Sequence, residues 1–176
     1  MHDTPIIRKI EKIAKSVQDW SRLYVTDLLK KDNTYDFNPS IMHCMCAYSS
    51  TVLFECLTWQ GIPDIALHHN EYHAFITKKD ILIDITACQF SDKFKEIEIV
   101  ELTDFLDQEI VKNYCAGYWD KKYTHYCVDS AYTELHCSSP NGFPSSQYFR
   151  KKQELFDAIN SAKLYLQSTH DKENML

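Results

Sequence analysis

The sequence predicts an α+β protein in which a central helix packs on an antiparallel sheet, with additional N- and C-terminal helices. Three observations lead to this fold class. An apolar helical stretch begins at Cys46 and ends near Gly61, strand-like runs follow it, and amphipathic helical patterns fill the first and last parts of the chain. A chain of 176 residues has the size of one domain with its own hydrophobic core, so we expect a single domain over residues 1–176.

Composition argues against several classes of partner. The net charge is -6 and the basic residues are scattered, so neither nucleic acid nor an anionic membrane is the expected main partner. No apolar stretch approaches a membrane span and no cleavable signal pattern is present, so we expect a cytoplasmic protein; a delivered effector would look the same. Seven cysteines without a secretory signal favour free thiols over a disulfide framework.

Residues 1–33 are predicted to form an N-terminal amphipathic helix. Thr4 can cap it, and Pro5 suits the first helical position. Lysines fall largely on one side of this helix, and apolar residues recur at helical spacing on the other. These apolar residues are Ile6, Ile10, Ile13, Val17, Trp20 and Leu28. The pattern indicates one long helix, or two, ending near residues 30–33 and packed on the core.

The predicted catalytic core spans residues 44–113 and opens with the central helix. Gly61 suits the left-handed position that follows a helix end, and Pro63 prevents the helix from continuing. Three runs after it have strand character. They are Ile65–His69, Tyr72–Thr77 and Ile81–Thr86.

A register follows if the turn between the last two strands is centred on Lys78 and Lys79. Counting outward from that turn places His73 directly opposite Asp84. Facing residues on neighbouring strands have Cβ atoms roughly 4.5 to 5.5 Å apart. An imidazole can therefore meet a carboxylate at this position.

The rest of the chain is predicted to continue with a strand over Ile97–Leu102 and a helix over Thr103–Asn113. Periodicity is then lost over residues 114–150, an aromatic-rich irregular segment that we expect to be a packed functional loop. Its tyrosines have the amphipathic character that suits the lining of a substrate cleft. A C-terminal helix is predicted within residues 151–168, over Lys151–Gln167, followed by a polar tail.

The residues at the start of the central helix and in the two strands suit thiol chemistry. A nucleophilic thiol must be largely thiolate near neutral pH, which a helix N-terminus and a neighbouring imidazolium both favour. Cys46 as the nucleophile, His73 as its base and Asp84 as the acid that orients the base meet these requirements. The backbone N–H of Cys46 would point to the developing oxyanion, with Asn38 or Gln89 as the candidate second donor.

Residues 44–90 resemble the core of transglutaminase-like proteins. The interval from Cys46 to Gly61-Ile62-Pro63 is similar to the family's core helix, in which the catalytic cysteine precedes a Gly-Ile-Pro helix ending. His73-Ala74-Phe75 looks like the family's His-Ala-aromatic strand, and Ile83-Asp84-Ile85-Thr86 like its Asp-containing strand. The resemblance implies a papain-like or transglutaminase-like fold, shared with papain-like peptidases, glutamine deamidases and arylamine acetyltransferases.

The resemblance also implies an activity. It points to a cysteine-dependent amide hydrolase or acyltransferase that forms a thioester at Cys46 and acts on a glutamine side chain or a peptide amide. The expected partner is a protein or peptide substrate, and we expect no cofactor and no metal. Two positions depart from the family pattern, because Cys44 replaces the usual glycine and Phe75 the usual tryptophan. Cys44, which also precedes the helix, is the alternative thiol.

Two other classes of function stay open. The first is a non-catalytic binding module that keeps this fold around an inert triad. The second is a zinc-stabilised interaction domain, for which the residue types are suitable although no Cys-x-x-Cys or His-x-x-x-His spacing organises them. The candidate zinc ligands are His43, Cys44, Cys46, Cys115, His125, Cys127, His136 and Cys137.

Overall fold

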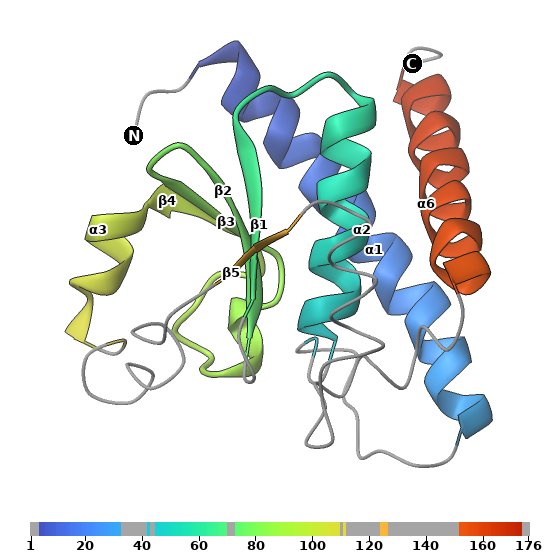
Figure 1. Ribbon diagram of the computed structural model, residues 1–176, viewed down its shortest axis with the longest axis horizontal. Coiled ribbons are helices and arrows are strands. Elements are labelled where there is room, and N and C mark those ends of the chain that lie inside the picture. The colour runs from blue at the N-terminus through green and yellow to red at the C-terminus, as the bar shows by residue number, and fades with distance from the viewer. Residues whose placement is uncertain are drawn as a thin grey trace.

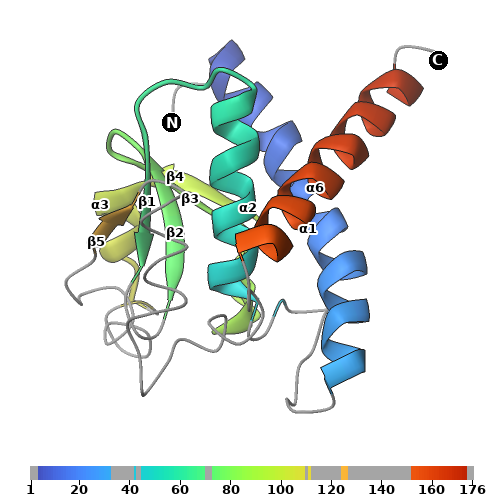
Figure 2. The ribbon, with the colours of Figure 1, turned by 45° about the vertical axis from the view of Figure 1, so that its right-hand side comes forward.

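A computed structural model describes residues 4–32, 42, 45–69, 73–109, 111, 124–126 and 152–173. The chain is α+β, as predicted, with helices stacked on one face of an antiparallel sheet and a short helix on the other (Figure 1). Helix α2 lies directly on the sheet, and α1 and α6 cover it on the outside (Figure 2). No helix in these ranges is long and apolar enough to cross a membrane.

Helix α1 (Pro5–Asp32) begins and ends where the sequence predicts. The backbone N–H of Ile7 donates to Thr4 Oγ1 at 3.3 Å, so the predicted cap is confirmed. Helix α6 (Lys152–Glu173) continues past the predicted end at Gln167. The two helices are joined by Trp20, whose Nε1 donates to Ser161 Oγ at 3.1 Å.

Helix α2 (Cys46–Trp59) ends at Gly61 through two backbone hydrogen bonds. The Gly61 N–H donates to Thr58 O and the Ile62 N–H to Leu57 O, both at 3.0 Å. This pairing is the Schellman motif, which requires a left-handed residue after the helix. Gly61 has a φ of 72°, so the helix ending predicted from the sequence is confirmed.

Within the described residues the sheet has five strands in the order β4-β3-β2-β1-β5, and every neighbouring pair is antiparallel. Its strands are β1 (Ile65–His69), β2 (Ala74–Lys78), β3 (Ile81–Asp84), β4 (Glu98–Glu101) and β5 (Thr124–Tyr126). The first four correspond to predicted strands, whereas β5 falls in the segment predicted to be irregular. The residues of β5 pair with β1, and this tertiary contact makes them a strand although the local sequence pattern does not predict one.

The helix predicted over Thr103–Asn113 is interrupted. Helix α3 (Leu102–Leu106) ends after five residues, where the N–H of Asp107 donates back to Thr103 O at 2.9 Å. No glycine or proline marks this ending, so the sequence pattern alone does not reveal it.

The predicted register of the β2–β3 hairpin is wrong by two residues. Lys78 pairs with Ile81, so the turn lies on Lys79 and Asp80, and Lys79 adopts a φ of 53°. Continuing this ladder places Asp84 opposite Phe75, one diagonal step from His73. Side chains alternate faces with a period of two, so a shift of two residues leaves Asp84 on the face where it was predicted.

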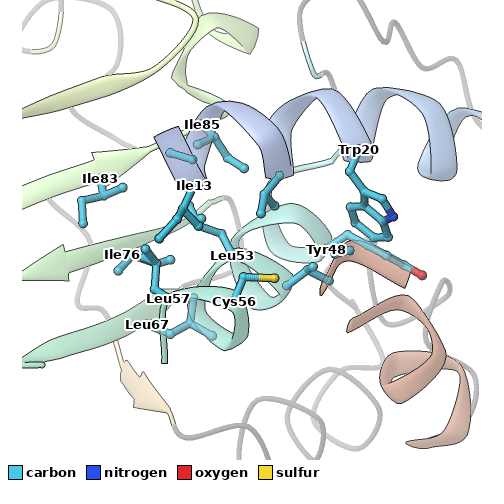
Figure 3. Close-up of a cluster of buried hydrophobic side chains, with 14 of the residues drawn as sticks. Ile13, Trp20, Tyr48, Leu53, Cys56, Leu57, Leu67, Ile76, Ile83 and Ile85 are labelled. Atoms are coloured by element: carbon cyan, nitrogen blue, oxygen red, sulfur yellow. The ribbon is translucent and has the colours of Figure 1, made fainter. Parts of the chain in front are cut away.

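The main core lies between the sheet and helices α1, α2 and α6. Figure 3 shows side chains from helices and strands converging on it, including Ile13, Trp20, Tyr48, Leu53, Cys56, Leu57, Leu67, Ile76, Ile83 and Ile85. A smaller cluster covers the opposite face of the sheet, where the rings of Phe94 and Phe105 stack with centroids 5.4 Å apart. Burial on both faces fixes the position of the central strands.

Candidate active site

Cys46, His73 and Asp84 lie at the same end of the central strands. Strands β2 and β3 are antiparallel, so β2 starts and β3 ends at this end of the sheet, and Figure 1 shows the first turn of α2 at the same end of the molecule. Cys46 is the first residue of α2 and is 7% exposed. No side chain caps this helix start within the described residues. The first N–H groups of an α-helix have no intrahelical acceptor, and a helix start favours negative charge.

Ser50 connects the helix to the strand that follows His73. Ser50 lies one helical turn after Cys46, on the same side of α2. Its buried hydroxyl donates to the carbonyl oxygen of Ala74 at 3.0 Å, and Ala74 is the residue after His73. This bond holds the thiol-bearing turn of α2 beside the histidine.

His73 and Asp84 form a buried pair. His73 Nε2 lies 2.6 Å from Asp84 Oδ2, and both side chains are 0% exposed. The other carboxylate oxygen, Oδ1, accepts from the backbone N–H of Thr86 at 2.7 Å and from its hydroxyl at 3.0 Å. Asp84 thus has partners on both oxygens, as a buried charge requires.

The pKa of His73 is raised to about 9. Burial alone lowers it, but the charge and hydrogen bond of Asp84, together with the hydrogen bond and charge of Cys46, outweigh burial. His73 is therefore an imidazolium at neutral pH. Because Asp84 occupies Nε2, Nδ1 is the ring nitrogen that remains for the Cys46 thiol.

Aromatic rings enclose this histidine. The rings of Phe90 and His73 meet edge to face with centroids 4.8 Å apart, and the Phe75 ring centroid lies 6.1 Å from that of His73 on the same face of the sheet. Phe75 also stacks on His68 at 5.1 Å. These apolar neighbours exclude water and strengthen the electrostatic interaction between His73 and Asp84.

Two other thiols of the described chain are poor nucleophiles. Burial raises the pKa of Cys56 to about 12 and that of Cys88 to about 11. Cys56 points into the main core (Figure 3). The alternative thiol, Cys44, lies outside the described residues, as do Cys115, Cys127 and Cys137.

The second oxyanion donor stays a prediction. Gln89 lies near the site in sequence, but its Nε2 donates to the carbonyl oxygen of Thr86 at 3.0 Å. Asn38, the other candidate, lies outside the described residues. The backbone N–H of Cys46 is the donor that the helix geometry supports.

Sequence reasoning missed Ser50, Thr86 and Glu98. An Asp followed two residues later by a Thr is a common local bonding pattern, so Thr86 was detectable from the sequence. Glu98 lies directly opposite Asp84 in the β3–β4 ladder and is 4% exposed. Burial raises the pKa of Glu98. The hydrogen bond from the Lys95 backbone N–H and the Lys95 charge lower this pKa, and the Asp84 charge raises it. Its position depends on strand pairing, which no local pattern gives.

No three His, Cys, Asp or Glu side chains within the described ranges gather as a metal site. Of the candidate zinc ligands, only Cys46 has a described side chain. A cavity of about 440 Å³ lies along α1 and has no residue of the Cys46, His73 and Asp84 group in its lining. The lining residues are Arg8, Glu11, Lys12, Lys15, Ser16, Ile97 and Thr169.

Comparison of the chain with protein-family models, with curated proteins and with solved structures gives no match. The geometry of the site is therefore the basis for proposing a function.

Proposed function

We propose that the protein is a cysteine-dependent enzyme that transfers an acyl group from an amide, with the Cys46, His73 and Asp84 arrangement of papain-like and transglutaminase-like enzymes. The observation that carries this proposal is the buried His73–Asp84 pair, in which His73 Nε2 lies 2.6 Å from Asp84 Oδ2. A histidine paired in this way, next to a thiol at a helix start, has the geometry of an activated nucleophile.

The chemistry follows from these positions. The Cys46 thiolate attacks the carbonyl carbon of a glutamine side chain or peptide bond, and the C–N bond breaks after His73 gives its proton to the departing nitrogen. Water or an amine then attacks the thioester carbon, His73 takes a proton from the attacking group, and the C–S bond breaks to release the product and the Cys46 thiolate. Asp84 keeps the imidazole oriented and stabilises its cation throughout. The Cys46 backbone N–H donates to the oxyanion in both steps.

A non-catalytic binding module is the second candidate, and the low exposure of Cys46, at 7%, favours it. A buried thiol that no reagent reaches would leave the triad as a structural feature. The two candidates differ in one measurable property, which is the reactivity of Cys46 in the folded protein.

The test is alkylation by iodoacetamide at neutral pH, with the modified cysteine identified by peptide mass spectrometry. We expect Cys46 to react in the folded protein, and we expect Cys56 and Cys88 to react only after unfolding because burial raises the pKa of each thiol. Cys46→Ala should abolish rapid labelling, whereas the control Cys88→Ala should leave it unchanged. Rapid labelling at another cysteine, or Cys46 that reacts only in denaturant, would contradict the proposal.

The acceptor and the amide are distinguished by three assays on peptide substrates. Ammonia release from glutamine peptides identifies a deamidase, incorporation of a primary amine identifies a transglutaminase, and a new N-terminus identifies a peptidase. Each activity should disappear in Cys46→Ala and in His73→Ala. Turnover that survives in Cys46→Ala would exclude the thioester route.

A further inference from the structure

We propose that Thr86 is a positioning residue of this site, a role that rests on the proposed function of Cys46, His73 and Asp84. Thr86 holds one oxygen of the Asp84 carboxylate so that the other oxygen is kept toward His73. Its effect on the imidazole and the thiol is exerted through Asp84.

The hydrogen bonds of Asp84 are divided between its two oxygens. Both bonds from Thr86 go to Oδ1, at 2.7 Å from the backbone N–H and 3.0 Å from the hydroxyl, whereas His73 contacts Oδ2 at 2.6 Å. Two donors that approach one oxygen from different directions oppose rotation of the carboxylate. Oδ2 is therefore presented to Nε2 in a single orientation.

Thr86 is itself anchored on both sides. Its side chain is 0% exposed, and its carbonyl oxygen accepts from the Gln89 backbone N–H at 3.1 Å and from Gln89 Nε2 at 3.0 Å. The preceding residue, Ile85, accepts at its carbonyl oxygen from Gln18 Nε2 of α1 at 2.8 Å. Because helix α1 and the turn after β3 both hold this segment, Thr86 is a rigid donor.

Fixing the carboxylate also fixes the ring. Asp84 is the partner of His73 at Nε2, and the direction of that bond sets the plane of the imidazole and the direction of Nδ1. If the carboxylate rotated, Nδ1 would face Cys46 for a smaller fraction of the time. The Thr86 donors also satisfy Oδ1 of the buried carboxylate without occupying the oxygen that His73 uses.

Thr86→Val tests the proposal because it keeps the shape of the side chain and removes only the hydroxyl donor. We expect the rate of Cys46 alkylation to fall about tenfold across the neutral pH range, the size of effect that loss of one hydrogen bond to a charged group gives. Thr86→Ser keeps the hydroxyl and should stay within about twofold of the wild-type rate. If Thr86→Val does not fold, Thr86→Ser and Thr86→Ala provide a second pair that differs by one hydroxyl.

A second readout does not depend on the reactivity of Cys46. The His73 proton shared with Asp84 should give a low-field imidazole resonance in the proton NMR spectrum, present in Thr86→Ser and broadened or lost in Thr86→Val. A wild-type alkylation rate in Thr86→Val, or an equal loss in Thr86→Ser, would overturn the positioning role.

Failure of the proposed enzyme function gives a different experimental result from failure of the positioning role of Thr86. If Cys46 of the wild-type protein does not react in the folded state, the enzyme hypothesis fails, and the imidazole resonance alone decides the role of Thr86. Loss of the resonance in Thr86→Val would then support orientation of the His73–Asp84 pair by Thr86. An unchanged resonance would end the proposal.

Discussion

His73 and Asp84 meet at 2.6 Å in a part of the protein that excludes solvent from both side chains. Burial disfavours the charged form of His73, which keeps its proton because the Asp84 carboxylate is present. Removing the Asp84 charge should therefore change the protonation of His73.

Asp84→Asn removes the negative charge and keeps the shape of the side chain. We expect the pKa of His73 to fall from about 9 to below 6.5, since burial lowers it and the main opposing interaction is gone. An NMR titration of the histidine ring measures this change. Asp104→Asn, at an exposed position on α3, should leave the titration unchanged. A pKa that stays near 9 in Asp84→Asn would show that another group holds the proton.

The same pair gives the protein a pH-dependent stability. The folded pKa of His73 lies above its unfolded value, so its contribution is fully present below about pH 6.5 and is lost as the pH rises through about 9. Denaturant unfolding of the wild-type protein should show this decline. We expect it to be absent in Asp84→Asn, whose stability should be flatter between these two pH values.

Glu98→Gln should stabilise the protein at neutral pH. The pKa of Glu98 is raised by burial first, so the ionised side chain destabilises the fold as the pH rises above 4.5. The amide keeps the Oε1 acceptor that the Lys95 backbone N–H uses at 2.7 Å. Unfolding free energies at pH 4 and pH 8 should differ from wild type only at the higher pH. Glu101→Gln, on the same strand, is the control, and an equal gain at both pH values would contradict the ionisation argument.

Ser50 and Ser49 offer a matched pair of buried hydroxyls. Ser50→Ala should destabilise the protein by about 1 to 3 kcal/mol because the Ala74 carbonyl loses its partner from the helix. The Ser49 hydroxyl has no hydrogen-bond partner among the described residues, so Ser49→Ala should be neutral or stabilising. Thermal unfolding of the two variants measures the difference. Equal losses of stability in the two variants would mean that the hydrogen bond from Ser50 to Ala74 does not stabilise the fold.

Gly61→Ala should destabilise the protein by about 1 kcal/mol through the backbone alone. A Cβ at Gly61 would meet no atom within 4 Å, so packing does not contribute, but the φ of 72° disfavours any residue with a side chain. Denaturant unfolding should detect this loss. Gln60→Ala, at a φ of -77°, is the neighbouring control and should be nearly neutral. A neutral Gly61→Ala would show that the helix end can relax.

Helices α1, α2 and α6 and strands β1 to β4 follow from local sequence. Thr4, Gly61 and the β-branched runs after α2 each carry a physical preference that acts over a few residues, and the structure confirms these elements. The sequence also predicts that His73 and Asp84 share one face of the sheet. Side chains alternate faces with a period of two, so a register error of two residues does not change the face on which each lies.

Other features depend on tertiary contacts. The turn between β2 and β3 requires Lys79 in a left-handed conformation, which its residue type does not favour. Strand β5 pairs with β1. Glu98 lies opposite Asp84 because β4 pairs with β3. These contacts involve partners distant in sequence, so periodicity and turn residues do not reveal them.

The Trp20–Ser161 bond between α1 and α6 spans 141 positions of the chain, whereas His73 and Asp84 are 11 apart. The entropy of closing a loop grows with the logarithm of its length, which makes the longer closure more costly by about 2 kcal/mol. The His73–Asp84 pair therefore depends on a contact that forms quickly, while the pairing of helices α1 and α6 is a slow, non-local event. During folding, and during synthesis before residue 161 has emerged, the β2–β3 hairpin that brings His73 and Asp84 together can form without the C-terminal helix.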